Sequence, residues 1–237
     1  MYQYMSHDQS EGLFMKPRVI IHNAVSLDGR IDWFEPDIVL YYDMTSHWKE
    51  DATLAGVDTL LAVPEDMEQE DLPDSFSPKI NQEDTRPFLV VPDSRGRMTN
   101  WDYWQQLSYW KTSIVLCSRR TPNRYLKQLE SHHIRYLVAG KDHVDFYEAL
   151  HRLNTEFGIT TIRVDSGGTL NGVLLRAGLV DEISLLIHPT LVGGVTPRSF
   201  FRAPDLESKQ PVINVRLSHL EEVRDDLLWV IYEVVKE

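Results

Sequence analysis

Cysteine is almost absent from this chain, since Cys117 is the one cysteine among 237 residues. A single thiol cannot form an internal disulfide, and it excludes every zinc site that needs two or more thiolates. The sequence also has no run approaching the roughly 18 apolar residues of a membrane span. Its first 15 residues lack the basic and apolar regions of a signal peptide. We therefore expect a cytoplasmic protein without a membrane anchor.

Basic residues are in the minority. The 24 lysines and arginines stand against 36 aspartates and glutamates, so the formal net charge is −12. This balance argues against a broad surface for nucleic acid or for an anionic membrane, although a local basic pocket can still hold a phosphate. The histidines have no recognisable metal-ligand spacing, so we expect no metal site; they include His132, His133, His188 and His219.

The composition is otherwise that of a globular domain, with 42% hydrophobic and 25% charged residues. We expect a loose N-terminal extension over residues 1–15 and one domain over residues 16–237. The segment from Pro64 to Pro87 is rich in proline and acidic residues, which predicts a surface loop beside the sheet.

Short apolar runs bounded by turn residues predict a series of strands. Most are continuous rather than alternating, as is typical of strands covered on both faces in a mostly parallel sheet. They are Arg18 to Val25, Thr59 to Val63, Phe88 to Val91, Ser113 to Cys117, Arg135 to Val138, Thr161 to Asp165 and Glu182 to His188. Near the end of the chain, Val215 to Leu220 and Leu227 to Val235 flank the acidic turn Glu221 to Asp226, which predicts an antiparallel hairpin.

Helical periodicity is clearest from Val144 to Phe157, where Gly158 can end the helix. Further helices are predicted at Leu170 to Ala177, Ser46 to Leu54 and Asn123 to Leu129. This alternation predicts an α/β fold with a mostly parallel central sheet and an antiparallel C-terminal edge hairpin.

The most informative stretch joins a strand to a helix through Gly167 and Gly168. Paired glycines let a ligand approach the backbone, and the N-terminus of the following helix favours a phosphate. The alternative is a plain strand-to-helix turn capped by Ser166 or Thr169. Asp165 ends the strand at the edge where open α/β sheets gather ligands. Its carboxylate can bind substrate hydroxyls or a ring amine, or it can simply accept hydrogen bonds from loop amides.

Two further clusters allow both a structural and a functional interpretation. Ser26, Asp28 and Arg30 suit a polar, phosphorylated ligand, but Asp28-Gly29 is also a strong turn signal. Ser118, Arg119 and Arg120 follow a central strand, and guanidinium groups match the 2′-phosphate that separates NADPH from NADH. Solvated surface arginines are the alternative there. A similar cluster of Asp93, Ser94, Arg95 and Arg97 is interpreted first as a turn.

Three stretches together resemble a known family. They are AVSLDGRI from Ala24 to Ile31, VVPDSRGRM from Val90 to Met98, and VDSGGTLNGVLLRAGLVDEISLLIHPTLVGG from Val164 to Gly194. They resemble the reductase domain of riboflavin-biosynthesis deaminase/reductases, the RibD C-terminal type. The resemblance implies a dihydrofolate-reductase-like three-layer fold, NADPH as cofactor and a homodimer. It also implies reduction of a diaminopyrimidine ribosylamino 5′-phosphate to its ribitylamino product.

The resemblance also implies roles for single residues. The NADPH pyrophosphate would be held by Gly167, Gly168, Thr169, Leu170 and Asn171, and Val25 would line the nicotinamide side. Asp165 stands where the family usually has a substrate-binding glutamate, while Ser26 and Asp28 would help to shape the substrate site. The catalytic proton would come from Asp165, Asp28 or a bound water.

One departure from the family pattern follows the strand predicted at Thr59 to Val63. The family commonly has Gly-x-x-Thr and then an aspartate there, whereas this chain has Val63 and Asp66 at the positions assigned to the glycine and the threonine. An extra carboxylate beside a phosphate would be repulsive.

The leading hypothesis is a stand-alone NADPH-dependent reductase of a phosphorylated pyrimidine ribosylamine, because the single cysteine excludes the zinc deaminase domain of the bifunctional relatives. The alternatives are the same fold and cofactor with another heterocyclic or carbonyl substrate, and a non-catalytic nucleotide-binding protein.

Overall fold

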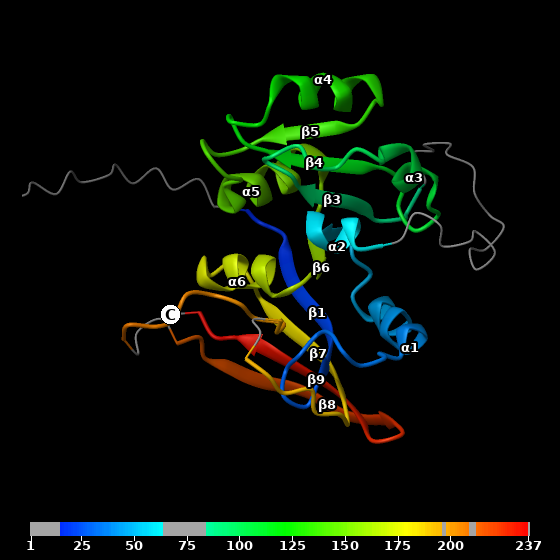
Figure 1. The fold of residues 1–237 in the computed structure, drawn as a ribbon, viewed down its shortest axis with the longest axis vertical. Coiled ribbons are helices and arrows are strands. Elements are labelled where there is room, and N and C mark those ends of the chain that lie inside the picture. Colours follow the sequence, from blue (N-terminus) through cyan, green and yellow to red (C-terminus); the bar gives the residue numbers. More distant parts are fainter. Residues whose placement is uncertain (1–14, 64–83, 196–197, 209–211, 237) are drawn as a thin grey trace, which may run out of the picture.

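Nine strands form one sheet in the part of the chain that the computed structural model describes, which is residues 15–63, 84–195, 198–208 and 212–236 (Figure 1). Their order is β5-β4-β3-β2-β6-β1-β7-β9-β8. The strands are β1 (Arg18–Ser26), β2 (Ala52–Ala55), β3 (Phe88–Pro92), β4 (Ser113–Cys117), β5 (Arg135–Val138), β6 (Thr161–Asp165), β7 (Glu182–His188), β8 (Val215–Arg224) and β9 (Leu227–Val234).

Neighbouring strands from β5 to β7 are parallel, and β9 is antiparallel to both β7 and β8. The predicted mostly parallel sheet with an antiparallel C-terminal hairpin is therefore confirmed. Because the seven strands from β5 to β7 in the sheet order are parallel, their carboxyl ends meet at one edge of the sheet. The hairpin turn is shorter than predicted: Asp225 and Asp226, both with positive φ, connect the strands, as in a two-residue hairpin loop.

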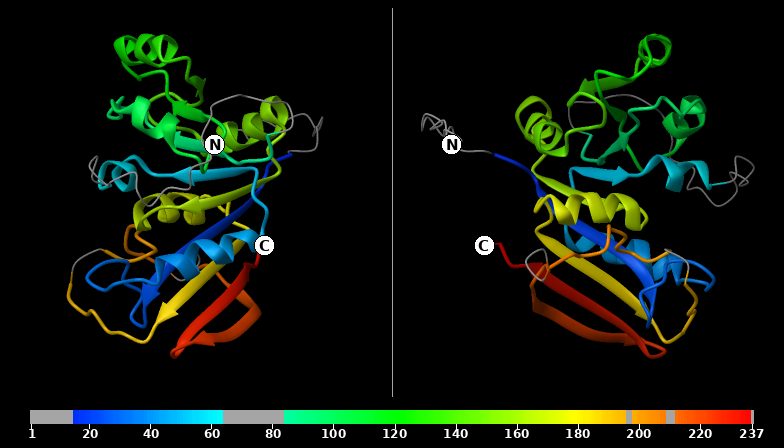
Figure 2. Two further views of the ribbon diagram at one scale, coloured as in Figure 1. Left: turned by 90° about the vertical axis from the view of Figure 1, so that its right-hand side faces the viewer. Right: turned by 60° about the vertical axis from the view of Figure 1, so that its left-hand side comes forward.

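Helices cover both faces of the sheet (Figure 2). On one face α5 (Phe146–Phe157) and α6 (Gly168–Arg176) pack on the strands, and on the other lie α1 (Ile38–Asp43), α2 (Val57–Leu61), α3 (Trp101–Gln106) and α4 (Asn123–Ser131). In β3, Val90 packs toward α5 and α6, whereas Leu89 and Val91 pack toward α2, α3 and α4. Each strand therefore buries both of its faces, which explains the continuous apolar runs.

The second strand and its neighbours differ from the prediction. The run Thr59 to Val63, predicted as a strand, belongs to helix α2 and the residues after it. The predicted helix Ser46 to Leu54 was also wrong, because a 3₁₀ turn at Met44–His47 is followed by β2 at Ala52–Ala55. This strand has only four residues, all buried, and so short an apolar run has no period that separates a strand from a helix.

Several other predictions can be placed directly. Six of the seven predicted strands match β1, β3, β4, β5, β6 and β7 to within one residue. Cys117 is fully buried in β4, and burial raises the pKa of its thiol to about 12, as suits a core residue. Apart from Met15, the predicted N-terminal extension lies outside the described residues. Residues 64–83 of the predicted surface loop also lie outside them.

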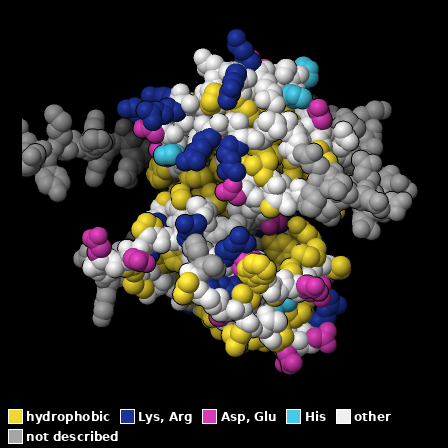
Figure 3. All heavy atoms as spheres, in the orientation of Figure 1, with side chains coloured by type: hydrophobic (Ala, Val, Ile, Leu, Met, Phe, Trp, Pro, Cys, Tyr) yellow, Lys and Arg dark blue, Asp and Glu magenta, His cyan; other side chains and the backbone are white. Residues whose placement is uncertain are grey.

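On the face of the molecule in Figure 3, basic and acidic side chains are interspersed, and hydrophobic side chains are exposed between them. None of the described helices is long and apolar enough to cross a bilayer.

Candidate functional site

Two adjoining cavities open at the carboxyl edge of the parallel strands. The larger has a volume of about 510 Å³ and the smaller about 250 Å³. Four residues line both: Ile31, Thr59, Ser166 and Gly167. A ligand in one cavity therefore lies against a ligand in the other across this shared wall. The hydroxyls of Thr59 and Ser166 lie 3.4 Å apart within it.

The larger cavity is bordered by cations and by the start of a helix. Its lining includes Arg95 and Arg97 from the turn after β3, and Arg198 and Arg202 from the segment that crosses α6. The first residues of α6 also line it, and the first turn of a helix presents unpaired amide groups and a positive dipole end. Such a cavity is suited to phosphate groups.

The smaller cavity is aromatic and contains one carboxylate. Phe34, Tyr41 and Tyr42 line it together with Asp165, and apolar residues such as Ile38 complete the wall. Desolvation raises the pKa of Tyr42 to about 12, with a further contribution from Asp165, so its hydroxyl keeps its proton at neutral pH. Flat apolar walls beside one hydrogen-bond acceptor suit a heterocycle that carries N–H groups.

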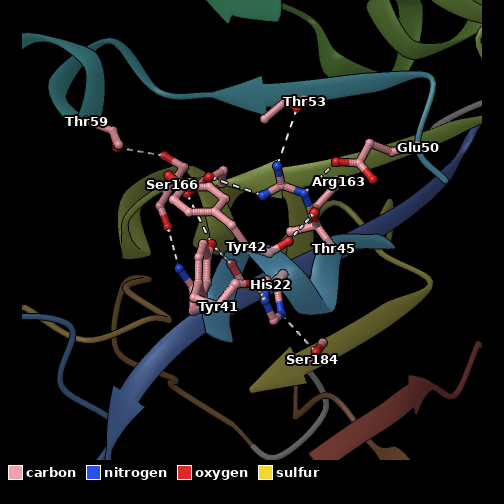
Figure 4. A network of polar contacts seen from close by, with 12 residues as sticks. His22, Tyr41, Tyr42, Thr45, Glu50, Thr53, Thr59, Arg163, Ser166 and Ser184 are labelled. Carbon is pink, nitrogen blue, oxygen red and sulfur yellow. Dashed lines mark hydrogen bonds and ion pairs between the residues drawn. The ribbon is translucent and has the colours of Figure 1, made fainter. Parts of the chain in front are cut away.

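Asp165 is held from behind by a buried polar network. Figure 4 shows three members of this network together, Arg163, Tyr41 and Glu50. Its carboxylate accepts hydrogen bonds from Arg163 Nη1 at 3.1 Å and from the Tyr41 hydroxyl at 3.2 Å. The Nε atom of Arg163 donates to Glu50 Oε1 at 2.8 Å. Burial alone would lower the pKa of Arg163, but the carboxylates of Asp165 and Glu50 raise it above the ordinary value.

His22 continues this network into the core. Its Nε2 lies 3.2 Å from the carbonyl oxygen of Tyr41, which can only accept, so we assign the ring proton to Nε2. Nδ1 then accepts from the Ser184 hydroxyl at 2.9 Å, which in turn accepts from Trp229 Nε1 at 2.9 Å. Burial, with Arg163 as a second cause, lowers the pKa of His22 to about 4, so the ring is neutral.

Comparison with known proteins identifies the family. The family model described as the RibD C-terminal domain matches residues 17–229. The chain belongs to the RibD C-terminal domain family. It is similar to the 2,5-diamino-6-ribosylamino-4(3H)-pyrimidinone 5′-phosphate reductase of Methanothermobacter thermautotrophicus, at 27% identity over 226 residues that cover 90% of this chain and 97% of that protein. The protein of the same name from Archaeoglobus fulgidus is 26% identical over 189 residues, which cover 76% of this chain and 84% of that one.

Solved structures agree on the fold of this RibD family member. A pyrimidine reductase-like protein from Corynebacterium diphtheriae superposes with a TM-score of 0.69 at 16% identity, over 93% of each chain. The resemblance to the RibD reductases and the dihydrofolate-reductase-like fold expected from it are thereby confirmed.

The structure corrects the predicted position of the Gly-x-x-Thr motif of the RibD family. Strand β2 ends at Ala55, and the residues that follow are Gly56-Val57-Asp58-Thr59. The Gly-x-x-Thr of the family is thus present, seven residues before the position assigned to it, and all four residues line the larger cavity. Val63 lies beyond α2 and is not among the residues lining either cavity, and Asp66 lies outside the described residues.

The glycine stretch has a mixed outcome. Gly167, Gly168, Thr169 and Leu170 line the larger cavity, and their predicted contact with a pyrophosphate stays a prediction. Gly168 is also required for packing, because a Cβ atom there would lie 2.0 Å from the carbonyl oxygen of Ser199. Asn171 is fully buried and does not line either cavity; its Nδ2 donates to Asn23 Oδ1 at 2.8 Å and to the Phe200 carbonyl at 2.7 Å. These contacts support a structural role for Asn171 in place of the predicted pyrophosphate contact.

Asp28 and Ser26 do not line either cavity and instead connect the end of β1 to the segment after β7. The Asp28 carboxylate accepts hydrogen bonds from the backbone N–H groups of Val192, at 3.0 Å, and Gly193, at 2.7 Å, and from the Ser26 hydroxyl at 2.7 Å. The Val192 N–H, with these other donors, lowers the pKa of Asp28 well below its usual range, so it holds no proton to donate at neutral pH. This placement favours a structural role for Asp28 over its predicted catalytic and substrate-binding roles.

Three further predicted cofactor contacts lie away from the cavities. Val25 is buried in β1 and does not line either one, whereas the preceding Asn23 and Ala24 line the smaller cavity. Ser118 is also buried, and its hydroxyl donates to the Asp142 carbonyl. Arg119 is exposed and is not among the lining residues of either cavity.

Two of the arginines that line the larger cavity, Arg95 and Arg97, come from the turn after β3. There Asp93 accepts hydrogen bonds from the backbone N–H groups of Arg97 and Met98, and Gly96 has a φ of 66°. The Thr121 hydroxyl donates to the Ser94 carbonyl at 3.0 Å, so the turn after β4 supports the turn after β3. Arg97 is paired with Asp58 at 2.6 Å across the cavity.

Some functional residues were not found from the sequence. Tyr41, Tyr42 and Phe34 lie in a segment with no recognisable pattern, and α1 has only six residues. The sequence did contain a pattern that could have identified Arg163. It stands two positions before Asp165 in an apolar strand, so strand alternation puts both charges on the same face. Among the described residues, no group of three or more potential metal ligands occurs.

Proposed function

We propose that this chain is an NADPH-dependent reductase of a phosphorylated ribosylaminopyrimidine. The names of its relatives support the reduction and the class of substrate, whereas NADPH is part of the proposal. The observation that carries the proposal is the pair of cavities that meet at Thr59 and Gly167. One has the cations and helix amides that phosphates require, and the other has aromatic walls around a carboxylate. Their common wall would bring a hydride donor and an acceptor ring into contact.

The residues of the larger cavity fit a nicotinamide dinucleotide. Its volume of about 510 Å³ lies in the range of cofactor sites. The amide groups at the start of α6 would bind the pyrophosphate, and Arg95 would meet a 2′-phosphate. When bound, the reduced nicotinamide supplies the hydride. Gly167 and Thr59 would position the ring at the wall between the cavities.

The smaller cavity would bind and orient the pyrimidine. Asp165 would accept N–H groups of the ring, and Tyr42 would cover one side of it. Reduction of the ribosylamino group to ribitylamino adds one hydride and one proton, and the proton would come from the Tyr42 hydroxyl, from Asp165 or from a water. The aromatic wall would exclude bulk water from this step.

Steady-state oxidation of NADPH, followed by absorbance, tests the proposal. We expect turnover with the diaminopyrimidine ribosylamino 5′-phosphate and stabilisation of the folded protein by NADPH against heat. NADPH binding without turnover of that substrate would indicate another heterocyclic or carbonyl substrate. Failure of NADPH both to stabilise the protein and to be consumed would refute the reductase assignment and favour a non-catalytic protein.

A homodimer and a cytoplasmic location remain part of this proposal through the family resemblance. Strand β8 supports the first, because Val215, Leu217 and Leu220 on this edge strand are 42%, 49% and 59% exposed. Light scattering at micromolar concentration tests it, and a monomer would remove it.

A further inference from the structure

Behind the carboxylate of the smaller cavity lies a cluster of buried charges. The side-chain exposures of Arg163 and Glu50 are 5% and 9%, whereas that of Asp165 is 24%. Only Asp165 lines the cavity. Two carboxylates and one guanidinium give this cluster a formal charge of −1. Burying three charges carries a desolvation cost, so the arrangement is not a simple means of stabilising the fold.

The contacts of Arg163 divide between two tasks. Its Nε points to Glu50, its Nη2 lies 3.5 Å from the Thr53 hydroxyl, and its Nη1 points to Asp165. Glu50 and Thr53 thus fix the guanidinium plane, and the third nitrogen, Nη1, reaches the carboxylate of Asp165. Because Arg163 and Asp165 are two residues apart on β6, the strand itself holds the pair in register (Figure 4).

Tyr41 completes the restraint from the other side. Its hydroxyl has one proton and two acceptors nearby, the carbonyl of His22 at 2.8 Å and Asp165 Oδ1 at 3.2 Å. The stronger contact is to His22, so Tyr41 can release Asp165 Oδ1 to a ligand without losing its own hydrogen bond. Arg163, in contrast, approaches Oδ2, and its guanidinium retains its charge throughout the accessible pH range.

We propose that Arg163, anchored by Glu50, is a positioning residue that fixes the direction in which Asp165 presents its carboxylate to N–H groups of the heterocycle. The inference rests on the proposed function, because it assigns the ring to the smaller cavity. It adds two residues that do not line either cavity to the determinants of substrate binding. Arg163 acts through Asp165 and need not touch the substrate.

The test is a cycle of variants in the full-length protein. Arg163→Met is combined with Glu50→Gln, so that no buried carboxylate is left without its cation. The probe is the free diaminopyrimidinone ring without its ribose phosphate, with binding measured by calorimetry. We expect the dissociation constant of the ring to rise roughly tenfold to hundredfold, and that of NADPH to stay within about twofold. Asp165→Asn should weaken ring binding to a similar extent.

The decisive outcome is the combination of both changes. If Arg163 acts through Asp165, adding Arg163→Met and Glu50→Gln to Asp165→Asn weakens ring binding no further. If the combined variant binds the ring more weakly than either parent variant, by the product of their separate effects, the proposal is overturned. An equal loss of ring and NADPH affinity would also overturn it, because it would indicate a purely structural role.

A matched control is the pair Arg18→Met with Glu182→Gln. It removes an ion pair between a half-exposed arginine and a nearly buried glutamate at the amino ends of β1 and β7, at the edge of the sheet opposite the cavities. Ring binding should survive in this control.

The result separates the two proposals. Ring binding with the expected cycle but no turnover of the phosphorylated substrate would refute the proposed function and leave the role of Arg163 intact. Wild-type protein that does not bind the ring at all would refute the positioning role.

Discussion

Asn171 and Asn23 join helix α6 to strand β1 through a hydrogen bond of 2.8 Å between their side chains. The same Asn171 amide donates to the carbonyl of Phe200, so one buried side chain ties together three segments that surround the two cavities. Asn23 itself donates to the Ser166 carbonyl at 2.9 Å in the shared wall. Asn171 thus supports the walls of the cavities from within the core.

Replacing Asn171 should therefore affect stability first. For Asn171→Ala we expect the free energy of unfolding to fall by about 2 kcal/mol, because buried acceptors on two segments lose their donor. Urea denaturation measures the change. Val173→Ala, on the half-exposed side of the same helix, should change it by less than about 0.5 kcal/mol. An Asn171 variant as stable as the wild type would contradict this role.

The glycines of α6 should differ sharply in what they tolerate. A Cβ atom at Gly172 would lie 1.8 Å from the Arg202 carbonyl oxygen, and one at Gly168 would lie 2.0 Å from that of Ser199. We expect Gly168→Ala and Gly172→Ala to lower the free energy of unfolding by about 3 kcal/mol each. At Gly167 the nearest atom, Ile31 Cδ1, would be 3.5 Å away.

Gly167→Ala is therefore the control for this series. It should unfold at nearly the wild-type urea concentration while weakening NADPH binding, because Gly167 lines the larger cavity. Equal destabilisation by all three substitutions would refute the distinction.

How much of this could be predicted from the sequence depends on the range of the interactions involved. Strands β4 to β7 and the glycine turn were predictable because each is a local pattern of apolar runs and turn residues. The roles of Asp28 and Asn171 were not, since their partners Val192 and Asn23 lie 164 and 148 residues away in the chain. The family motif was found at the glycines but misplaced at Gly56, because a four-residue strand was missed.

Asp28 should be important for stability at neutral pH and dispensable for catalysis. Its pKa is lower in the folded protein than its ordinary value, so its contribution is complete above pH about 4 and is lost as the pH falls through the folded pKa. We expect Asp28→Asn to be less stable than wild type at pH 7, and the difference to shrink in acid. Denaturation curves from pH 7 to about pH 2 measure it. A loss of kcat greater than about tenfold in Asp28→Asn, at a temperature where it is folded, would restore the catalytic role.

His22 should make the protein sensitive to mild acid. Its pKa of about 4 in the folded protein lies below the ordinary value of 6.5, so the unfolded chain takes up the proton first. Stability is then complete above pH 6.5 and declines as the pH falls toward 4. Lowering the pKa of His22 from 6.5 to about 4 corresponds to about 3 kcal/mol of stability lost in acid. His22→Gln should remove this part of the pH dependence, as followed by urea denaturation at pH 7, 5.5 and 4. An unchanged slope in the variant would assign the acid sensitivity to another group.

Cofactor preference should depend on the turn after β3 instead of the turn after β4. Arg95 lines the larger cavity, whereas Arg119 does not. A guanidinium group pairs with phosphate oxygens by charge-assisted hydrogen bonds. We therefore expect Arg95→Ala to weaken NADPH binding roughly tenfold to hundredfold and to leave NADH binding nearly unchanged. Arg119→Ala is the matched control and should alter neither. Thermal stabilisation by each cofactor, titrated separately, gives the four dissociation constants. Weaker NADPH binding in Arg119→Ala, with Arg95→Ala unaffected, would return the 2′-phosphate site to Ser118 and Arg119.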